Sequence, residues 1–303
     1  MAAIPFLDEA AVRELLTYEE LIPAMAGALA ALSAGRVVQP VRSIVPVADH
    51  RGFLGVMPAY AGALGAKLVT FYPENRGTHT HHALILLFQP DTGEPLAVLD
   101  GRLITEMRTA AASAVATDRL ARADAQVLAI LGAGVQAASH LAALRRVRPF
   151  REVRVWSPRR AAAFAREHGV IAAASAEAAV RGADVIVTAT SATTPVLAGA
   201  WLAPGAHVNA VGACRPDWRE LDDALVRRAR VIVDSRDAAK VESGDVIAAG
   251  RIDAELGEVV AGTLPGRTSP AEVTLFKSVG VAVEDVVSAA LVLERARAAG
   301  RSA

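Results

Sequence analysis

The chain has 303 residues, enough for about two domains of ordinary size. Lysine plus arginine equal aspartate plus glutamate at 32 each, so the formal net charge is zero and no basic excess indicates a nucleic-acid partner. The one cysteine, Cys214, excludes an intrachain disulfide framework and fits a reducing compartment. No apolar run approaches the ~20 residues of a membrane helix, and no basic-then-apolar leader is visible. We therefore expect a cytoplasmic, enzyme-sized protein without a membrane partner.

The first elements in chain order are two predicted helices. Asp8 is a suitable cap for a short first helix. Thr17 and Glu20 then have the spacing of a capping box, but Pro23 would lie inside a helix that began there. A short turn followed by a helix over residues 23–32 satisfies both signals, because proline is well tolerated at the first helical position.

The next segment is rich in predicted strands. We predict them at Val37–Val47, Gly52–Met57, Lys67–Phe71, Ala83–Phe88 and Leu96–Leu99. Asp91-Thr92-Gly93 is a hairpin-turn signal before the last of these, and Leu103–Ala121 reads as one long, largely buried helix. The segment has too few helices to cover both faces of its sheet. We therefore expect a homodimer built through this sheet.

From Gln126 onward the pattern alternates between strand and helix. Strands are predicted at 127–131, 152–156, 184–189, 207–211 and 230–234, with a weaker one near 170–173, and helices near 135–147, 159–167, 175–181 and 219–228. This alternation predicts a Rossmann-type, doubly wound parallel sheet. A last helix, Val283–Ala298, is expected to pack back on the N-terminal part. The predicted fold is α/β, with an NAD(P)-binding domain at 120–279 and a discontinuous α+β domain at 1–119 plus 280–303.

The most informative motif follows the first strand of that alternation. Val127–Leu131 runs into Gly132-Ala133-Gly134-Val135-Gln136-Ala137 and then a good helix sequence. Gly132 permits the turn, Gly134 lets the backbone approach a pyrophosphate, and Ala137 replaces the third glycine of the dinucleotide fingerprint. The N–H groups at the helix start would face the phosphates. Residues after the other strand ends are candidates for cofactor contact as well.

The end of the second strand bears on the choice of nicotinamide. NAD-binding folds usually carry an acid there that binds the ribose 2′-hydroxyl, but this chain has Ser157-Pro158-Arg159-Arg160. A hydroxyl and two guanidiniums suit a 2′-phosphate, because arginine pairs with phosphate in bidentate geometry. The alternative is that the arginines are solvated residues at the start of an exposed helix. We expect NADP(H) to be preferred, with NAD(H) possible.

Several stretches together resemble the ornithine cyclodeaminase/mu-crystallin family over nearly the whole chain. They are QPVRSIVPV at 39–47, RGFLGVMPAY at 51–60, KLVTFYPENRG at 67–77, LDGRLITEMRTAAASAVAT at 99–117, ILGAGVQA at 130–137, NAVGACRPDWRELDD at 209–223, VDSRDAAKVESGD at 233–245 and TLFKSVGVAVED at 274–285. The resemblance is strongest to the ketimine reductases of the family. It implies that the N-terminal domain binds substrate and forms a dimer, and that the second domain binds NAD(P).

The resemblance also implies a substrate site with three basic residues. They map onto Arg42, Lys67 and Arg108. An arginine fork would fix a ketimine carboxylate, and a desolvated Lys67 with a lowered pKa could donate a proton to the imine nitrogen. Each has a structural alternative: Arg42 could be a solvated edge-strand residue, Lys67 a charge that protects a sheet edge, and Arg108 one member of a buried ion pair.

The remaining predicted site residues combine the resemblance with the fingerprint turn and the strand ends described above. Substrate contacts are assigned to Met57, Cys214 and Arg215, and cofactor contacts to Thr80, His81, Gly132, Ala133, Gly134, Val135, Gln136, Ser157, Arg159, Thr190, Val211 and Ser278. The histidines at 79, 81 and 82 could instead bind a metal ion, but no carboxylate or thiol motif accompanies them. We predict no metal site and place Thr80 and His81 near the cofactor.

Cys214 separates the activities within the family. Cyclodeaminases carry an aspartate at this position, and that acid assists deamination and ring closure, so its absence favours the reductases. We expect an NAD(P)H-dependent reductase of cyclic ketimines that forms proline or pipecolate. The alternatives are an alanine-type dehydrogenase or acyclic imino-acid reductase, an ornithine cyclodeaminase, and an NADP-dependent binding protein with little turnover.

Overall fold

The computed structural model describes residues 4–301, and they divide into two compact units. Unit 1 joins the residues up to Arg108 with those from Val281 onward, and unit 2 comprises Thr109–Gly280. The long helix α3 (Arg102–Leu120) runs through the boundary. The domain limits that we predict from the sequence stay predictions, and their outermost residues, 1 and 303, lie outside the described part of the chain.

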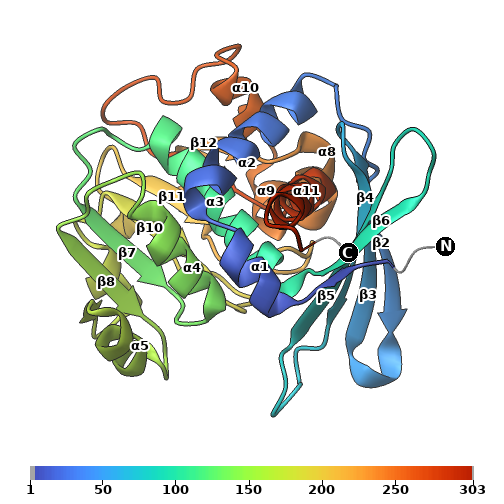
Figure 1. Ribbon diagram of the computed structural model, residues 1–303. Helices are drawn as coiled ribbons and strands as arrows, with labels where there is room; N and C mark the ends of the chain where they lie inside the picture. The colour runs from blue at the N-terminus through green and yellow to red at the C-terminus, as the bar shows by residue number, and fades with distance from the viewer. Residues whose placement is uncertain (1–3, 302–303) are drawn as a thin grey trace. The chain divides into compact units, whose positions relative to one another are not determined.

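Unit 1 is built around a six-stranded sheet in the order β1-β6-β5-β4-β3-β2. Its strands are β1 (Phe6–Leu7), β2 (Ser43–Val47), β3 (Gly52–Tyr60), β4 (Leu64–Phe71), β5 (His81–Phe88) and β6 (Pro95–Asp100), and its helices are α1 (Glu9–Leu15), α2 (Tyr18–Ser33) and α11 (Ala282–Ala298). Strands β2 to β6 pair antiparallel with their neighbours, whereas β1 is parallel to β6. The C-terminal helix α11 packs on β3, β4 and β5, so the end of the chain covers the sheet (Figure 1).

Two sequence expectations in unit 1 are wrong. Helix α2 begins directly after Thr17 and carries Pro23 inside it, without the predicted turn. Burial of Leu21, Met25 and Leu29 on one face stabilises the longer helix and outweighs the backbone hydrogen bond that proline removes. The strand expected at 37–47 forms only over Ser43–Val47, because only these residues pair continuously with β3. Before them, Val38 makes one isolated bridge to Tyr60.

Unit 2 is a doubly wound sheet of eight parallel strands in the order β13-β12-β14-β11-β10-β7-β8-β9. The strands are β7 (Val127–Leu131), β8 (Glu152–Trp156), β9 (Ile171–Ala172), β10 (Val185–Thr188), β11 (His207–Ala210), β12 (Arg230–Val233), β13 (Ala254–Glu255) and β14 (Thr274–Lys277). The helices are α4 (Val135–Leu144), α5 (Ala161–His168), α6 (Ala176–Val180), α7 (Asp223–Arg228), α8 (Arg236–Glu242), α9 (Gly244–Ala249) and α10 (Leu256–Val260). The predicted Rossmann-type fold is confirmed.

Strand order reverses between β7 and β10, which places a topological switch point there. In open parallel sheets, ligands bind beyond the carboxyl ends of the strands at such a point. Helix α7 begins later than the predicted residue 219, because the side chain of Asp222 caps it by accepting from the backbone N–H of Leu225. Strand β14, which lies between β11 and β12, is an element that the sequence pattern did not predict.

Over residues 4–301, no single helix has the length and apolar character needed to cross a membrane. Helices α1 and α2 meet those criteria only when taken as a pair, and the pair is bent by 91°.

Candidate active site

A buried charge cluster lies between the sheet and the C-terminal helix of unit 1. Lys67 on β4 is only 2% exposed, and its Nζ lies 2.6 Å from Oδ2 of Asp285 on α11. Arg108 donates from Nε to Oδ1 of the same aspartate at 3.0 Å and from Nη1 to Oε2 of Glu284 at 2.8 Å. The two carboxylates are fully buried. One aspartate therefore joins two of the predicted site residues.

Local structure explains why two acids stand at the start of α11. Glu284 and Asp285 occupy the first turn of the helix, where its dipole favours negative charge. The backbone N–H of Val281 donates to Oε2 of Glu284 at 3.2 Å, as in one half of a capping box. The side chain of Gln39 accepts from the N–H of Val283 at 2.8 Å, which ties the segment leading to Arg42 to the same turn.

The electrostatics of the cluster follow from its burial. Burial lowers the pKa of the Lys67 ammonium to about 8; Asp285 opposes this shift, while Arg108 and then Arg42 add to it. Burial alone would raise the pKa of Asp285, but the charges and hydrogen bonds of Arg108 and Lys67 hold it below its ordinary value. Lys67 is thus poised to exchange a proton near neutral pH, beside a carboxylate that stays ionised.

His81, the first residue of β5, lies in the same electrostatic field. Burial lowers its pKa to about 3, and the positive charges of Lys67 and Arg108 contribute. Its imidazole is therefore neutral at pH 7. The rings of His79 and His82 contact each other at 5.9 Å, and within the described residues no three His, Cys, Asp or Glu side chains are grouped to hold a metal ion.

The other predicted residues of unit 1 surround this cluster to different extents. Met57, 2% exposed, is the direct partner of Lys67 in the β3–β4 register and so forms an apolar neighbour of the amine. Arg42 is half-buried and close enough to act on the pKa of Lys67. Thr80 is exposed, and its carbonyl accepts from the N–H of Tyr72 at the base of the β4–β5 loop.

The residues of the glycine fingerprint in unit 2 have the geometry of a phosphate-binding turn. Gly132 has φ +122°, and a Cβ there would overlap the carbonyl of Ala189. Gly134 is the N-cap of α4, and a Cβ on it would meet no atom within 4 Å. Val135 at the helix start is 54% exposed, so the helix N-terminus is open to a ligand. Ala133 is buried and Gln136 half-buried. This turn fits the pyrophosphate of a dinucleotide.

The loop after β8 lies beside that turn. Leu131 and Trp156 are paired at the ends of their strands, and the N–H of Gly132 donates to the carbonyl of Trp156 at 2.9 Å. Ser157 is half-buried, and Arg159 is exposed. The loop thus offers a hydroxyl and a guanidinium, and no acid, at the position where the ribose of a dinucleotide is usually bound.

The remaining predicted residues of unit 2 follow β10, β11 and β14. Thr190 lies two residues after the end of β10, and Val211 directly follows β11. Cys214 Sγ lies 3.4 Å from the carbonyl of Val211, and the guanidinium of Arg215 lies 5.1 Å from the ring of Trp218. Ser278 is buried, and its hydroxyl donates to Asp234 at 3.0 Å.

Sequence reasoning missed the acids that complete these sites. Glu284 and Asp285 interrupt a long apolar run from Val279 to Leu293, and two adjacent charges in such a run are a usable signal for a buried pair. Glu220 lies in the stretch 209–223, where it is fully buried and accepts hydrogen bonds from the end of β10 and from the loops after β10 and β11. Its spacing gave no signal of that role.

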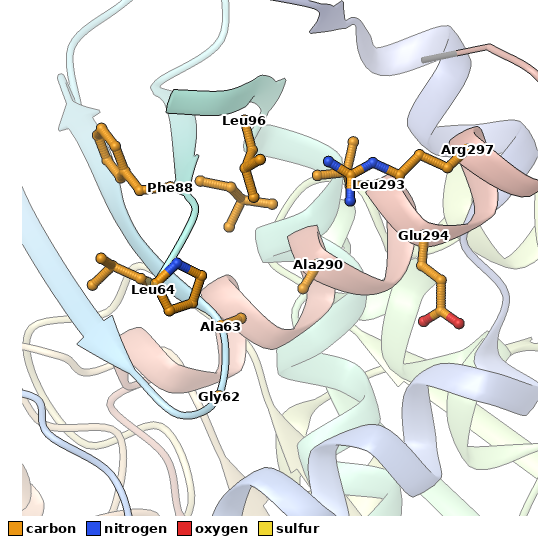
Figure 2. Close-up of a pocket in the computed structure, with 11 residues that line it drawn as sticks. Gly62, Ala63, Leu64, Phe88, Leu96, Ala290, Leu293, Glu294 and Arg297 are labelled. Carbon is orange, nitrogen blue, oxygen red and sulfur yellow. The ribbon is translucent and has the colours of Figure 1, made fainter. Parts of the chain in front are cut away.

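A pocket of about 220 Å³ lies elsewhere in unit 1, toward the C-terminal end of α11. Leu64, Phe88 and Leu293 line its apolar part, and α11 adds the charged Glu294 and Arg297 (Figure 2). None of the predicted site residues lines it, so its volume gives no support to the substrate assignment.

Comparison with known proteins shows the family of the chain. Residues 5–300 match the ornithine cyclodeaminase/mu-crystallin family. The ketimine reductase mu-crystallin of Mus musculus is 53% identical over 287 residues, covering 90% of this chain and 91% of that protein. The structure of Thermococcus litoralis Δ1-pyrroline-2-carboxylate reductase in complex with NADH and L-proline has a TM-score of 0.93 at 39% identity and covers 98% of each chain. An archaeal alanine dehydrogenase dimer with bound NAD also has a TM-score of 0.93, at 34% identity, and covers 99% of this chain and 98% of its own. The chain belongs to the ornithine cyclodeaminase/mu-crystallin family.

Proposed function

We propose that this protein is an NAD(P)H-dependent reductase of cyclic ketimines such as 1-pyrroline-2-carboxylate or 1-piperideine-2-carboxylate, which gives a cyclic L-amino acid such as proline or pipecolate. The observation that carries the proposal is the buried cluster in which Lys67 has a pKa of about 8 beside Asp285 and Arg108. The reductase names of the mouse protein and of the T. litoralis structure support the same reaction.

The chemistry assigns a role to each group. A bound reduced nicotinamide supplies the hydride that adds to the imine carbon. The electron pair of the C=N bond moves to nitrogen, and the ammonium of Lys67 donates the proton that nitrogen needs. Asp285 holds that ammonium in place at 2.6 Å. Arg108 and Arg42 bind the carboxylate and so fix the plane of the imine.

The cations of the cluster favour an anionic substrate. Lys67 and Arg108 contact Glu284 and Asp285, and the positive charge of Arg42 lowers the pKa of Lys67. A substrate carboxylate is attracted by all three cations.

The other predicted contacts complete the proposal. Met57, Cys214 and Arg215 form substrate contacts, the first two as apolar or polarisable walls. Thr80 and His81 contact the cofactor, together with the fingerprint turn, Ser157, Arg159, Thr190, Val211 and Ser278. NADPH is preferred because the loop after β8 lacks an acid and presents Arg159.

The functional unit is proposed to be a homodimer formed through the unit 1 sheet. Helix α11 covers one face of that sheet, and side chains on the other face, such as Val45 and Leu84, are 52% and 43% exposed. An archaeal relative is described as a dimer. Light scattering at micromolar concentration should show a dimer; a stable monomer contradicts this part of the proposal.

A panel of cyclic imines and 2-oxo acids, run with and without ammonia and with NADPH or NADH, tests the reaction. Reduction of a preformed cyclic imine without ammonia is the expected result. Activity that depends on ammonia and an open-chain 2-oxo acid would instead favour an alanine-type dehydrogenase, which the likeness to an archaeal alanine dehydrogenase makes the second candidate. If the protein binds the cofactor but converts no substrate, the result favours a binding protein with little turnover.

A further inference from the structure

Glu220 is a fully buried carboxylate in unit 2 that accepts four hydrogen bonds from three residues. Its Oε1 accepts from the N–H of Thr190 at 2.8 Å and from the hydroxyl of Thr190 at 2.7 Å. Its Oε2 accepts from the hydroxyl of Thr188 at 2.9 Å and from the N–H of Gly212 at 2.8 Å. One side chain thus joins the loop after β10 to the loop after β11.

These loops leave the carboxyl ends of neighbouring parallel strands, on the side of the switch point formed by β10 and β11. Gly212 approaches Thr190 so closely that a Cβ on the glycine would overlap both the carbonyl of Thr190 and the carboxylate of Glu220. A parallel sheet of this type binds a dinucleotide at the loops that follow the carboxyl ends of its strands. Glu220 is hydrogen-bonded to both loops, so their mutual position depends on it.

The backbone of Glu220 is itself anchored. Asp245, at the start of α9, accepts from the N–H of Glu220 at 3.2 Å and from the N–H of Leu221 at 3.1 Å. Lys277, fully buried at the end of β14, lies 3.9 Å from Asp245. A second buried acid thus fixes the backbone from which the Glu220 carboxylate extends toward the two loops.

We propose that Glu220 is a positioning residue for cofactor binding: it fixes Thr190 and Gly212 in the arrangement that receives the dinucleotide. The inference rests on the proposed function only in taking NAD(P)(H) as the ligand of unit 2. Glu220 needs no contact with the cofactor for this role, because it acts through the peptide groups of the two loops.

The variant Glu220→Gln separates this role from simple packing. A carboxylate accepts at both oxygens, whereas an amide accepts at one and donates at the other. The hydroxyls of Thr188 and Thr190 can turn to accept from the amide, but the N–H groups of Thr190 and Gly212 cannot. One loop must then lose its anchor, although the side chain keeps its size.

The matched control is Asp184→Asn, which lies at the opposite ends of the strands in the same sheet. Asp184 accepts from the N–H groups of Gln126 and Val127 at 2.8 and 3.0 Å, so it also ties two strands together through backbone hydrogen bonds. It precedes β10, at the amino ends of the strands, away from the loops that Glu220 holds. Both variants should lower Tm of the protein without ligand.

The measurement is the Kd of NADPH and NADH, followed by nicotinamide fluorescence in the unmodified protein and in each variant. Loss of a hydrogen bond to a charged group predicts a Kd about tenfold or more higher in Glu220→Gln. Asp184→Asn should leave both Kd values unchanged. In turnover, KM for the cofactor should rise more than kcat falls. Equal Kd values for Glu220→Gln and the parent, in a folded protein, overturn the proposal.

If Glu220→Gln does not fold, Thr188→Val provides the second test. It removes one donor to Oε2, keeps the carboxylate, and alters a residue at the end of β10 that is fully buried. A Kd raised about threefold is expected from loss of a weaker hydrogen bond, and an unchanged Kd contradicts the role of Glu220. If the unmodified protein binds NADPH but reduces no imine, the proposed reaction fails while this binding test still stands.

Discussion

Buried carboxylates with two different kinds of partner can be compared, one example from each unit. In unit 1, Asp285 and Glu284 face the side-chain cations of Lys67 and Arg108. In unit 2, Asp234 accepts from backbone N–H groups of Val279 and Gly280 at 2.8 and 2.7 Å, besides one hydroxyl. A carboxylate paired with cations shifts the pKa values around it, whereas one that binds peptide N–H groups fixes the backbone. The cluster in unit 1 therefore shifts the pKa values of its neighbours, whereas Asp234 in unit 2 fixes the backbone after β14.

Removing a cation from the unit 1 cluster should have the largest effect on catalysis. Arg108→Ala removes one partner of a buried charge group, which typically costs ~3–5 kcal/mol, so kcat/KM should fall by roughly two to four orders of magnitude. Lysine should rescue only partly, because a point charge cannot replace the guanidinium fork. Steady-state kinetics on a cyclic ketimine measures this. Arg102→Ala is the control, since Arg102 lies on the same helix but pairs with Glu9 and Glu106. A folded Arg108→Ala protein within threefold of the parent removes this residue from the site.

The second largest effect is expected for Arg159, on the preference between NADPH and NADH. NADPH should be preferred over NADH, and Arg159→Ala should remove much of that preference, because a charge-assisted contact with phosphate is worth roughly 1.5–3 kcal/mol, or ten- to over a hundredfold. The ratio of kcat/KM for the two cofactors is the readout. Arg166→Ala, an exposed arginine in the following helix, should leave the ratio unchanged. Equal efficiency of the unmodified protein with both cofactors contradicts the interpretation of the loop after β8.

The dependence of kcat/KM on pH should distinguish the buried acids of the two units. Lys67 must be protonated to donate, so kcat/KM should decline as pH rises above about 8, the pKa that burial gives its ammonium. Asp285 raises that pKa, so Asp285→Asn should move the decline to lower pH by roughly one unit or more. Asp245→Asn, a buried acid in unit 2, should leave its position unchanged. A decline that does not move in Asp285→Asn indicates that another group supplies the proton.

The smallest expected effect concerns Cys214. Cys214→Asp should not create efficient ornithine cyclisation, because one acid does not supply a pocket that orients the δ-amine. Ammonia release from ornithine should stay at background in this variant and in the parent. Release by the parent at a rate that rivals imine reduction would favour a cyclodeaminase.

The parts of the fold that local pattern determines could be predicted from the sequence. The fingerprint turn at Gly132 and Gly134 and the strand at 127–131 follow from residue types next to one another. Strand β14 could not be found in this way, because its four residues end in Lys277 and its place between β11 and β12 depends on pairing with distant strands. The helix through Pro23 likewise depends on tertiary burial, which overrides local propensity.

The candidate sites divide in the same manner. The resemblance supplied Lys67 and Arg108, and the structure places both in one cluster. Their acidic partners could not be derived from spacing, because Arg108 and Asp285 are 177 positions apart. For Glu220, the motif around it carried family resemblance but no indication that its carboxylate faces two loops.

The distance along the chain between Arg108 and its acids has a consequence for synthesis. At about 5–20 residues per second, the ribosome needs roughly 9–35 s to add the 177 residues between Arg108 and Asp285. During that time Lys67 and Arg108 have been made, but the anions that neutralise them have not. All residues of unit 2 are added to the chain before α11 is complete. A nascent chain that stops before Val281 therefore contains every residue of the nucleotide-binding unit, while its other unit must keep two cations in water that the finished protein buries.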